Sequence, residues 1–435
     1  MNRDVLYLLL VLSGVGLNFF RQRLWNRPWN SWLFLGLPAL AMVWFLLEVT
    51  DCPWFRDFKA AYYPAGKLVL ESPSRLYYAH ICVVGFVNIP IVALLFLPFS
   101  QLRYSIAVTA FTVLGTAFVV AACYAILRLT EARGWRRSAL IGSFAVNGPL
   151  IYSMKEGNST HFFLLVLLFL FVLTEKKRDF VVGSLIAVSA LIKIPIGLLG
   201  IYFLFRRRWR VVAGLGVTLT VVAAASVWMF GVAPHLAWIQ RCVGPYVGKP
   251  MAAFNVQSAD GFLARLMTDG NVLNWIPLDV GLDFHVARYA LIGSLLLPVL
   301  VILWSSGPPR TIREEYLELS IMIPTLLTVF PVSWTHYYLL MLLPFGLYLG
   351  NKIDFPDGKA WHACMCLTFL AVSLPVLRVQ PADPVLEYLL FKFLYSHYFL
   401  GGCAALGLLL AARLRSFQNA PGTSSRRGSS AATVS

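Results

Sequence analysis

Charged residues are scarce in this chain of 435 residues, because Asp, Glu, Lys and Arg together make up only 13% of it, whereas hydrophobic residues make up 59%. A soluble protein of this size cannot bury so much apolar surface, since surface grows too fast relative to volume. The composition therefore excludes an assembly of soluble domains. It predicts one integral membrane domain whose apolar side chains are covered by lipid.

Acidic residues are particularly few, with 20 Asp and Glu against 36 Lys and Arg and a formal net charge of +16. Such an excess could indicate nucleic-acid binding, but the basic residues cluster in short runs between apolar stretches, which is typical of cytoplasmic loops. Anionic lipid headgroups suffice as counter-ions. Membrane lipids are therefore expected partners and nucleic acid is not. The basic runs are Arg21/Arg23/Arg27, Arg128/Arg133/Arg136/Arg137, Lys176/Lys177/Arg178, Arg206/Arg207/Arg208/Arg210 and Arg413/Arg415 with Arg426/Arg427.

The seven cysteines show no spacing typical of a zinc site, and no nucleotide-binding loop is visible. Cys52 and Cys82 flank a predicted external loop and could form a disulfide. The first external loop holds few carboxylates, which argues against a tightly held divalent ion. No cofactor is expected, and metal dependence stays open. The inverted repeats found in many secondary transporters are not visible either.

Apolar runs separated by basic clusters predict an all-α, polytopic transmembrane bundle of about twelve helices, with residues 5–20 as a thirteenth or an interfacial anchor. The predicted organisation is an N-terminal helix and basic loop over 1–30, a transmembrane catalytic domain over 31–414, and a disordered cytoplasmic tail over 415–435. The spans are predicted near 31–50, 105–127, 138–153, 160–174, 180–193, 195–206, 211–230, 286–304, 316–331, 337–350, 360–378 and 393–413.

The charge pattern places the long loops near 51–104 and 231–285 on the external side. Residues 81–99 are apolar enough to span, but a crossing there would invert every later loop against the charge bias. We therefore expect a helix lying on the external face. The pair of spans over 180–206 is predicted to be a helical hairpin broken at Pro195.

Asp57 follows the first large apolar helix and precedes an aromatic-rich run. A partly shielded carboxylate at the membrane boundary would have a raised pKa and could take a proton from a hydroxyl group. Position alone, however, favours an ordinary solvated or helix-capping aspartate, and Asp51 is a second carboxylate nearby. Lys193 stands in an apolar stretch, where a lysine is costly unless it faces a cavity or an anion. Snorkelling to the interface explains Lys193 equally well.

The two later external segments also carry polar residues. Arg265 follows a run of amides and a hydroxyl that suits a sugar or a phosphate, although turns that satisfy their own backbone are the alternative. His336 could bind a phosphate or orient a carboxylate, whereas its neighbours could be an aromatic belt. Taken together, a base and several cations or donors on one side of the membrane suit displacement of a lipid phosphate from a sugar.

These residues carry a resemblance to the GT-C superfamily of integral membrane glycosyltransferases. More narrowly, the chain is similar to the bacterial family containing the polyprenol-phosphate-mannose-dependent mannosyltransferase of phosphatidylinositol mannoside synthesis. The resemblance covers roughly residues 31–350, and its most specific part is the Ser-Trp-x-His motif. Its motifs are Asp57-Phe-Lys-Ala-Ala-Tyr62 with Leu76-Tyr77, Gly157-Asn158, Gly183 through Lys193-Ile-Pro195, Asn255-Val-Gln257-Ser258 with Arg265, and Pro331-Val-Ser333-Trp334-Thr-His336-Tyr337-Tyr338.

The resemblance implies that Asp57 is the catalytic base, with His336 beside it at the reaction centre. It implies that Arg265 and Lys193 face the carrier phosphate. Substrate contacts are expected from Tyr62, Asn158, Asn255, Gln257, Ser258 and Trp334. The chain departs from the family at Gly157-Asn158, where a Gly-Gln pair is common, and at Ile89-Pro90, where a double proline is common.

The sequence thus predicts transfer of a sugar, with mannose expected, from a polyprenyl-phosphate carrier to a lipid or glycan hydroxyl, on the external face of a bacterial plasma membrane. One alternative is a transporter or flippase of lipid-linked sugars, which would carry charges along a path through the membrane. Another is a glycan polymerase or ligase with a diphosphate-linked donor, which product analysis would distinguish.

Overall fold

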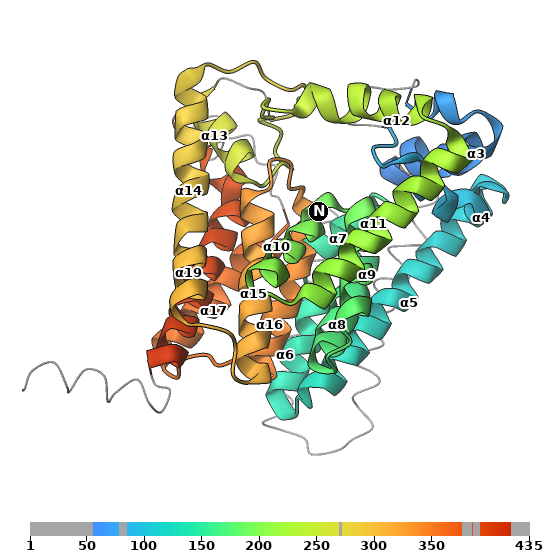
Figure 1. Cartoon of the computed structure of the whole chain (residues 1–435). Coiled ribbons are helices and arrows are strands. Elements are labelled where there is room, and N and C mark those ends of the chain that lie inside the picture. The colour runs from blue at the N-terminus through green and yellow to red at the C-terminus, as the bar shows by residue number, and fades with distance from the viewer. Residues whose placement is uncertain (1–54, 78–84, 269–271, 376–384, 386–391, 419–435) are drawn as a thin grey trace, which may run out of the picture.

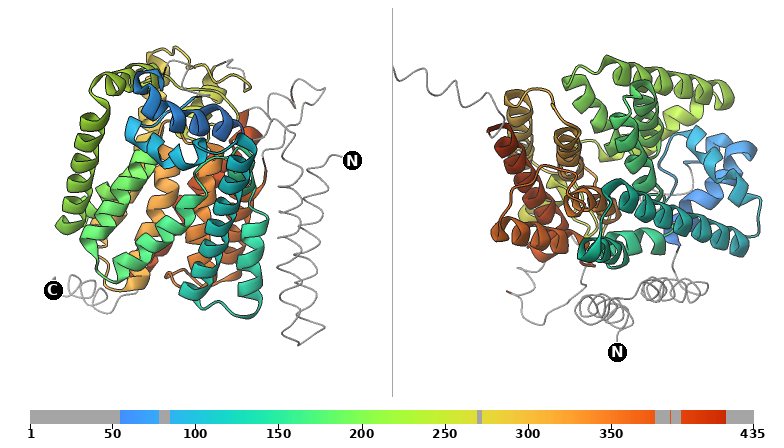
Figure 2. Two further views of the ribbon diagram at one scale, coloured as in Figure 1. Left: turned by 90° about the vertical axis from the view of Figure 1, so that its right-hand side faces the viewer. Right: turned by 90° about the horizontal axis from the view of Figure 1, so that it is seen from below.

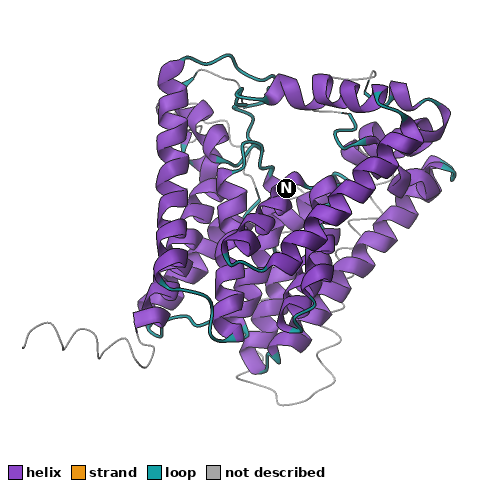
Figure 3. Ribbon diagram, viewed as in Figure 1, coloured by secondary structure: helices purple, strands orange, loops and turns teal. Residues whose placement is uncertain are grey.

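The computed structural model describes residues 55–77, 85–268, 272–375, 385 and 392–418. Within these residues every regular element is a helix, and loops join the helices (Figures 1 and 3). The all-α prediction is therefore confirmed for this part of the chain. The predicted count of about twelve helices is not confirmed, because several apolar stretches are divided into shorter helices.

Several predictions fall outside the described residues: the helix over 5–20, the loop to residue 30, the span over 31–50, and the side chains of Asp51, Cys52 and Cys82. At the predicted start of the C-terminal tail, residue 415, the chain is still helical. The last described helix is α19 (His397–Gln418). Residues 415–418 include neither Gly nor Pro, so their helix propensities do not end the helix at residue 415.

Four described elements are long and apolar enough to cross a membrane: α5 (Tyr104–Thr130), α11 (Trp209–Phe230), α14 (Leu282–Ser305) and the element Leu394–Gln418, which contains α19. In Figure 1, α14 forms the left edge of the bundle, and α11 runs obliquely to the right of its centre. Large apolar side chains on them face outward, for example Trp228, which is 87% exposed. Because water does not favour such a surface, lipid covers it and the chain is an integral membrane protein.

Around the centre of the bundle are further helices, most of them too short to span alone: α6 (Gly134–Ala145), α7 (Gly148–Lys155), α8 (Phe162–Glu175), α15 (Ile312–Val329), α16 (Leu342–Leu349) and α17 (Lys359–Ser373). The largest buried apolar cluster lies among them. Helix α15 is buried on nearly all sides, which is typical of a helix enclosed by others rather than by lipid.

The predicted hairpin over 180–206 is present. It consists of α9 (Asp179–Ile192), a 3-10 turn η6 (Ile194–Gly197) and α10 (Leu198–Phe205). Arg208, just after α10, forms an ion pair with Asp179, the first residue of α9. Both ends of the hairpin therefore lie together, and the chain turns back at Lys193, where Pro195 prevents helix continuation. In Figure 2 these green helices lie beside the long yellow-green helix α11, against which α9 packs.

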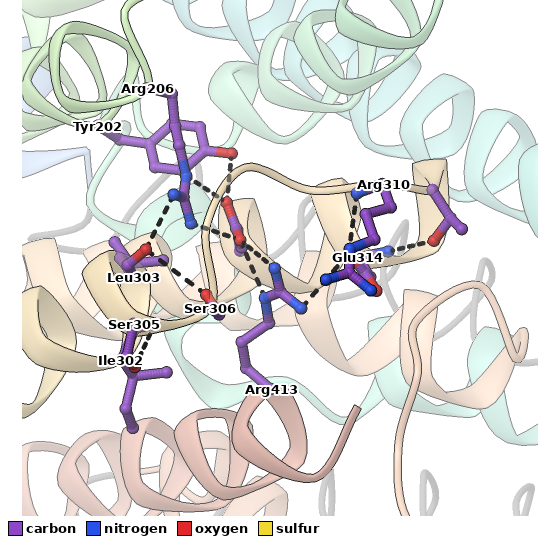
Figure 4. A network of polar contacts seen from close by, with 11 residues as sticks. Tyr202, Arg206, Ile302, Leu303, Ser305, Ser306, Arg310, Glu314 and Arg413 are labelled. Carbon is purple, nitrogen blue, oxygen red and sulfur yellow. Dashed lines mark hydrogen bonds and ion pairs between the residues drawn. The ribbon is translucent and has the colours of Figure 1, made fainter. Parts of the chain in front are cut away.

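A network of buried charges fixes the open end of this hairpin (Figure 4). Glu318 of α15 accepts hydrogen bonds from Tyr202 Oη at 3.0 Å and from Arg206 Nε at 2.8 Å. Arg413 of α19 donates to the same carboxylate at 2.9 Å and lies 3.4 Å from Glu314. Because buried charges persist only when paired, the network connects the hairpin to α15 and α19.

The opposite end of the bundle, at the top of Figure 1, is capped by short helices. They are a π-turn η3 (Phe58–Tyr62), α3 (Tyr63–Glu71), η4 (Pro73–Arg75), η5 (Pro90–Phe96), α4 (Leu97–Ser100), α12 (Ala233–Trp238), η7 (Ile239–Val243), η8 (Gly244–Tyr246), α13 (Ala259–Met267) and η9 (Thr335–Met341). Residues 90–100 pack against α3 as two short helices and do not form a span. This arrangement agrees with the prediction of a surface helix over 81–99.

Candidate active site

The capped end of the bundle contains a cavity of about 310 Å³. Segments far apart in the sequence meet there: the first described loop, the end of α7, the tip of the hairpin, and the segments around residues 255, 275 and 335. The lining residues are Arg56, Asp57, Ala61, Tyr62, Gly85, Val87, Tyr152, Glu156, Asn158, Lys193, Asn255, Asn274, Trp275, Ile276, Trp334, His336 and Tyr337.

Asp57 is positioned by the backbone of the loop that follows α7. The N–H groups of Phe55 and Asp57 donate hydrogen bonds of 2.9 Å to the carbonyls of Lys155 and Glu156. Gly157 follows with φ +62°, and an added Cβ there would lie 2.7 Å from the Phe55 ring. Glycine is therefore required at this turn, both for its backbone conformation and for the close approach of Phe55.

Asn158 lies between Asp57 and Lys193 and contacts both. Its Nδ2 donates to Asp57 Oδ2 at 2.5 Å, and Lys193 Nζ donates to its Oδ1 at 2.9 Å. The ammonium also lies 5.1 Å from the centre of the Tyr337 ring, a cation–π distance. Lys193 thus lines a cavity. Of the two explanations that the sequence offered for this lysine, a cavity and snorkelling to the interface, the structure shows the cavity.

The carboxyl group of Asp57 has an environment suited to a base. Burial raises its pKa above the ordinary 3.8, and this effect outweighs the opposing effects of the Asn158 hydrogen bond, Lys193 and Arg56. Asp57 lines the cavity, and its Oδ1 has no hydrogen-bond partner among the described residues. An acceptor hydroxyl could therefore donate to this oxygen.

His336 is only 6% exposed, yet neither ring nitrogen has a hydrogen-bond partner in the described part of the chain. The ring stacks on Tyr152 and packs edge-on against Tyr337. Burial and the nearby Lys193 hold the pKa of His336 well below 6.5, so the imidazole is neutral. An unpaired, buried imidazole at a cavity wall can donate one hydrogen bond and accept another from a ligand.

Two distant segments form the outer wall. Val256 and Trp334 make an isolated antiparallel bridge, and the N–H of Thr335 donates to the Asn255 carbonyl at 2.8 Å. Trp275 Nε1 donates to Asn255 Oδ1 at 2.8 Å. Asn255 and Trp334 therefore reach the cavity together with Trp275.

Tyr62 also lines the cavity. Its ring stacks on Phe96 with centroids 4.3 Å apart, and its hydroxyl lies 3.3 Å from Ser159 Oγ. Burial and the neighbouring Asp57 raise its pKa above 10, so the phenol stays protonated. It can act as a hydrogen-bond donor but not as a base.

The structure does not bring Arg265, Gln257 or Ser258 to the cavity. Arg265 is fully buried, and its Nη1 donates to the carbonyls of Ala253 and Val256 at 2.9 Å. The predicted contact of Arg265 with a carrier phosphate is therefore replaced by a structural role in the loop that carries Asn255. The Arg265 guanidinium is taken up by the backbone carbonyls of Ala253 and Val256. The position of Arg265 in the sequence did not indicate these contacts.

Gln257 and Ser258 likewise stabilise the fold. The Gln257 amide donates to the Phe254 carbonyl at 2.6 Å and to the Tyr395 carbonyl. Ser258 Oγ donates to the Pro331 carbonyl at 2.6 Å and caps α13 through the N–H of Gly261. Both side chains thus form hydrogen bonds with backbone groups of the turns in and around this segment. This is the alternative to substrate binding that the sequence left open.

Sequence reasoning missed several lining residues, above all Arg56, Glu156, Tyr152 and Trp275. Arg56 directly precedes Asp57, and Glu156 directly precedes the Gly157-Asn158 motif. Their position next to these motifs was the one feature of the sequence that could have indicated them. Nothing in the sequence pointed to Tyr152 or Trp275. Among the described residues, no group of three or more His, Cys, Asp and Glu side chains is placed to hold a metal ion.

Comparison with known proteins matches the chain to one family. The model of glycosyltransferase family 87 matches residues 86–333, more than half of the chain. A search of curated proteins finds no match. The matched range includes the tip of the hairpin and the Asn255 segment, although Asp57, Trp334 and His336 lie outside it. The chain is an integral membrane protein that belongs to glycosyltransferase family 87.

Proposed function

We propose that this protein transfers a hexose, with mannose expected, from a polyprenyl-phosphate carrier to a hydroxyl of a lipid or glycan acceptor, with inversion at the anomeric carbon. The carrying observation is that Asp57 lines the cavity with its Oδ2 held by Asn158, while its Oδ1 has no hydrogen-bond partner in the part of the chain that the structure describes. Membership of glycosyltransferase family 87 supports sugar transfer. We also propose that the helical bundle has the GT-C architecture that the sequence resemblance implies.

In the proposed reaction, Asp57 accepts the proton of the acceptor hydroxyl as its oxygen attacks the anomeric carbon. The bond from that carbon to the carrier phosphate breaks, and the phosphate leaves with an additional negative charge. A base within hydrogen-bond reach of the hydroxyl contributes typically about 10²–10⁴-fold to such a step. The raised pKa of Asp57 makes it a stronger base than an exposed carboxylate.

The departing phosphate needs positive charge and hydrogen-bond donors. Among the described residues, Lys193 and Arg56 are the cations that line the cavity, so we assign the phosphate to them rather than to Arg265. His336 is neutral and supplies an N–H donor, either to the leaving oxygen or to a sugar hydroxyl. Trp334 and Trp275 provide apolar faces for a sugar ring at the outer wall.

We further propose that the cavity opens to the external side. Basic runs at Arg206–Arg210 and near Arg313 lie at the opposite end of the bundle, as expected of a cytoplasmic surface. Cys242, in the cap over the cavity end, is disulfide-bonded. Structural disulfides persist in oxidising, extracytoplasmic compartments, and a lipid carrier would supply sugar where nucleotide sugars are absent.

The test is label transfer in membranes that contain the full chain. Wild type, Asp57→Asn and Asp283→Asn are incubated with radiolabelled polyprenyl-phosphate mannose and native lipid extract. Asp283 is an exposed aspartate in the first turn of α14, so its variant is a matched control for loss of one carboxylate at the same end of the bundle. We expect transfer by wild type and Asp283→Asn, and a loss of about 10²-fold or more in Asp57→Asn.

Undiminished transfer by Asp57→Asn at equal protein level would contradict the assigned base. If wild type transfers no sugar from any polyprenyl-phosphate donor but moves lipid-linked sugar across vesicle membranes, the flippase alternative replaces this proposal. Transfer from a diphosphate-linked donor alone would instead identify a polymerase or ligase.

A further inference from the structure

The side chain of Asn158 was expected to contact substrate, yet the protein itself uses most of its hydrogen-bonding capacity. Its Oδ1 accepts from Lys193 Nζ at 2.9 Å, from the Thr160 N–H at 3.0 Å and from Thr160 Oγ1 at 2.8 Å. Its Nδ2 donates to Asp57. Since three donors face one end and a carboxylate faces the other, only this orientation of the amide is favourable.

Thr160 determines that orientation without contacting the cavity. It is 1% exposed, does not line the cavity, and directs both its backbone N–H and its hydroxyl at Asn158 Oδ1. It lies in the turn before α8, so its position follows from the packing of that helix in the main apolar cluster. A rotated amide would lose both hydrogen bonds and turn its oxygen toward the Asp57 carboxylate.

The arrangement keeps a carboxylate and an ammonium apart, although they share one partner. A direct ion pair between Asp57 and Lys193 would reduce the basicity of the carboxylate and occupy the ammonium. With the amide between them, Asp57 keeps an Oδ1 that has no hydrogen-bond partner among the described residues, and Lys193 keeps its remaining donors for an anion.

We propose that Asn158 and Thr160 are positioning residues: Thr160 orients the Asn158 amide, which acts as a neutral spacer between the base Asp57 and the cation Lys193. This inference rests on the proposed function, because the advantage of the spacer depends on both groups acting in sugar transfer. The geometry that carries it does not depend on the identity of the sugar or the acceptor.

The experiment measures the protonation of Asp57 without any substrate. Full-length protein in lipid vesicles is treated with dicyclohexylcarbodiimide, which reacts with protonated carboxyl groups, and labelling of the Asp57 peptide is followed by mass spectrometry between pH 4 and 9. Other charged or titratable groups around Asp57 are the same in every variant: Arg56, Tyr62, Glu156, Lys193, His336 and Tyr337.

Leucine at position 158 keeps the bulk that separates Lys193 from Asp57 but removes a hydrogen bond that stabilises the charged carboxylate, so the labelling midpoint should rise. We expect Asn158→Leu to raise it by about one pH unit or more, Thr160→Val by a smaller amount, and Thr160→Ser, which keeps the hydroxyl donor, by nothing measurable. The same order should appear in kcat for sugar transfer, with Thr160→Ser restoring the rate that Thr160→Val loses.

An unchanged midpoint in both Asn158→Leu and Thr160→Val, in protein that melts as wild type does, would overturn the inference. If Asn158→Leu does not fold, the labelling midpoints of Thr160→Val and Thr160→Ser are compared instead. Equal midpoints in these two variants would then overturn the inference. Because labelling needs no sugar donor, a wild type that transfers no sugar would refute the proposed function while the midpoints still report on the spacer.

Discussion

The backbone N–H of Asp57 donates a hydrogen bond of 2.9 Å to the carbonyl oxygen of Glu156. This contact joins two segments that are a hundred residues apart and brings both carboxylate side chains to one cavity. The position of the proposed base therefore depends on the turn at Gly157, which immediately follows Glu156.

Gly157→Ala should destabilise the protein by about 1–3 kcal/mol and reduce sugar transfer strongly. An alanine would adopt φ +62° with strain, and its Cβ would lie 2.7 Å from the Phe55 ring and 2.8 Å from Phe58 Cβ. Thermal unfolding in detergent and label transfer measure the two effects. The control is Gly216→Ala in α11, where an added Cβ meets nothing within 4 Å. Equal effects of the two variants would contradict the assigned role of the turn.

The rate of transfer should depend on pH through Asp57. A base must be deprotonated, and burial raises the pKa of Asp57 above 3.8. As pH falls, kcat/KM should therefore decline with a midpoint above that of an exposed aspartate. The measurement is kcat/KM against pH, with unfolding monitored over the same range. A rate that stays constant down to pH 4 would show that Asp57 is not the base or is not buried in the working enzyme.

His336 should act as a neutral hydrogen-bonding group. Its pKa lies well below 6.5, so its charge does not change near neutral pH and it should contribute no ionisation to the rate profile there. We expect His336→Phe to lower kcat by about 10²-fold, as is typical when one transition-state donor is lost. His336→Gln, a neutral donor and acceptor, should recover part of that loss. Equal kcat values in the two variants would exclude a hydrogen-bonding role.

Arg56 and Arg265 should differ in what their loss affects. Arg56 is exposed and lines the cavity, so Arg56→Gln should raise KM for the donor several-fold and leave the melting temperature unchanged. Arg265→Gln removes hydrogen bonds to Ala253 and Val256. It should lower stability by about 1–3 kcal/mol. If Arg265→Gln instead raised KM for the donor without loss of stability, the phosphate contact implied by the sequence resemblance would be restored.

Glu318 should be required for stability at the opposite end of the bundle. Glu318→Ala leaves Arg206 and Arg413 without their shared buried carboxylate, and removing one partner of a buried ion pair costs about 3–5 kcal/mol. The control is Asp354→Asn, which breaks a partly exposed pair with Arg313 and should cost about 0–1 kcal/mol. Thermal unfolding in detergent compares them, and a small effect of Glu318→Ala would mean that water reaches the network.

Some features of the site were available from the sequence because they are local. A lysine in an apolar stretch has a high free-energy cost, and this cost at Lys193 together with the break at Pro195 predicted the tip of the hairpin. The structure places Lys193 at the cavity. Asp57 and His336 also reach the cavity, as do Tyr62, Asn158, Asn255 and Trp334. In contrast, Arg265, Gln257 and Ser258 carry the same kinds of polar group and are directed into the protein.

Composition by itself determined that this chain lies in a membrane and is helical, because so many apolar side chains can be covered only by lipid and a backbone in lipid must satisfy its own hydrogen bonds. Only the tertiary structure decided which polar side chains face the cavity. Two of the partners of the Asn158 side chain are Asp57, 101 residues earlier, and Lys193, 35 residues later. Such contacts depend on how helices pack, and no local pattern of residues records that packing.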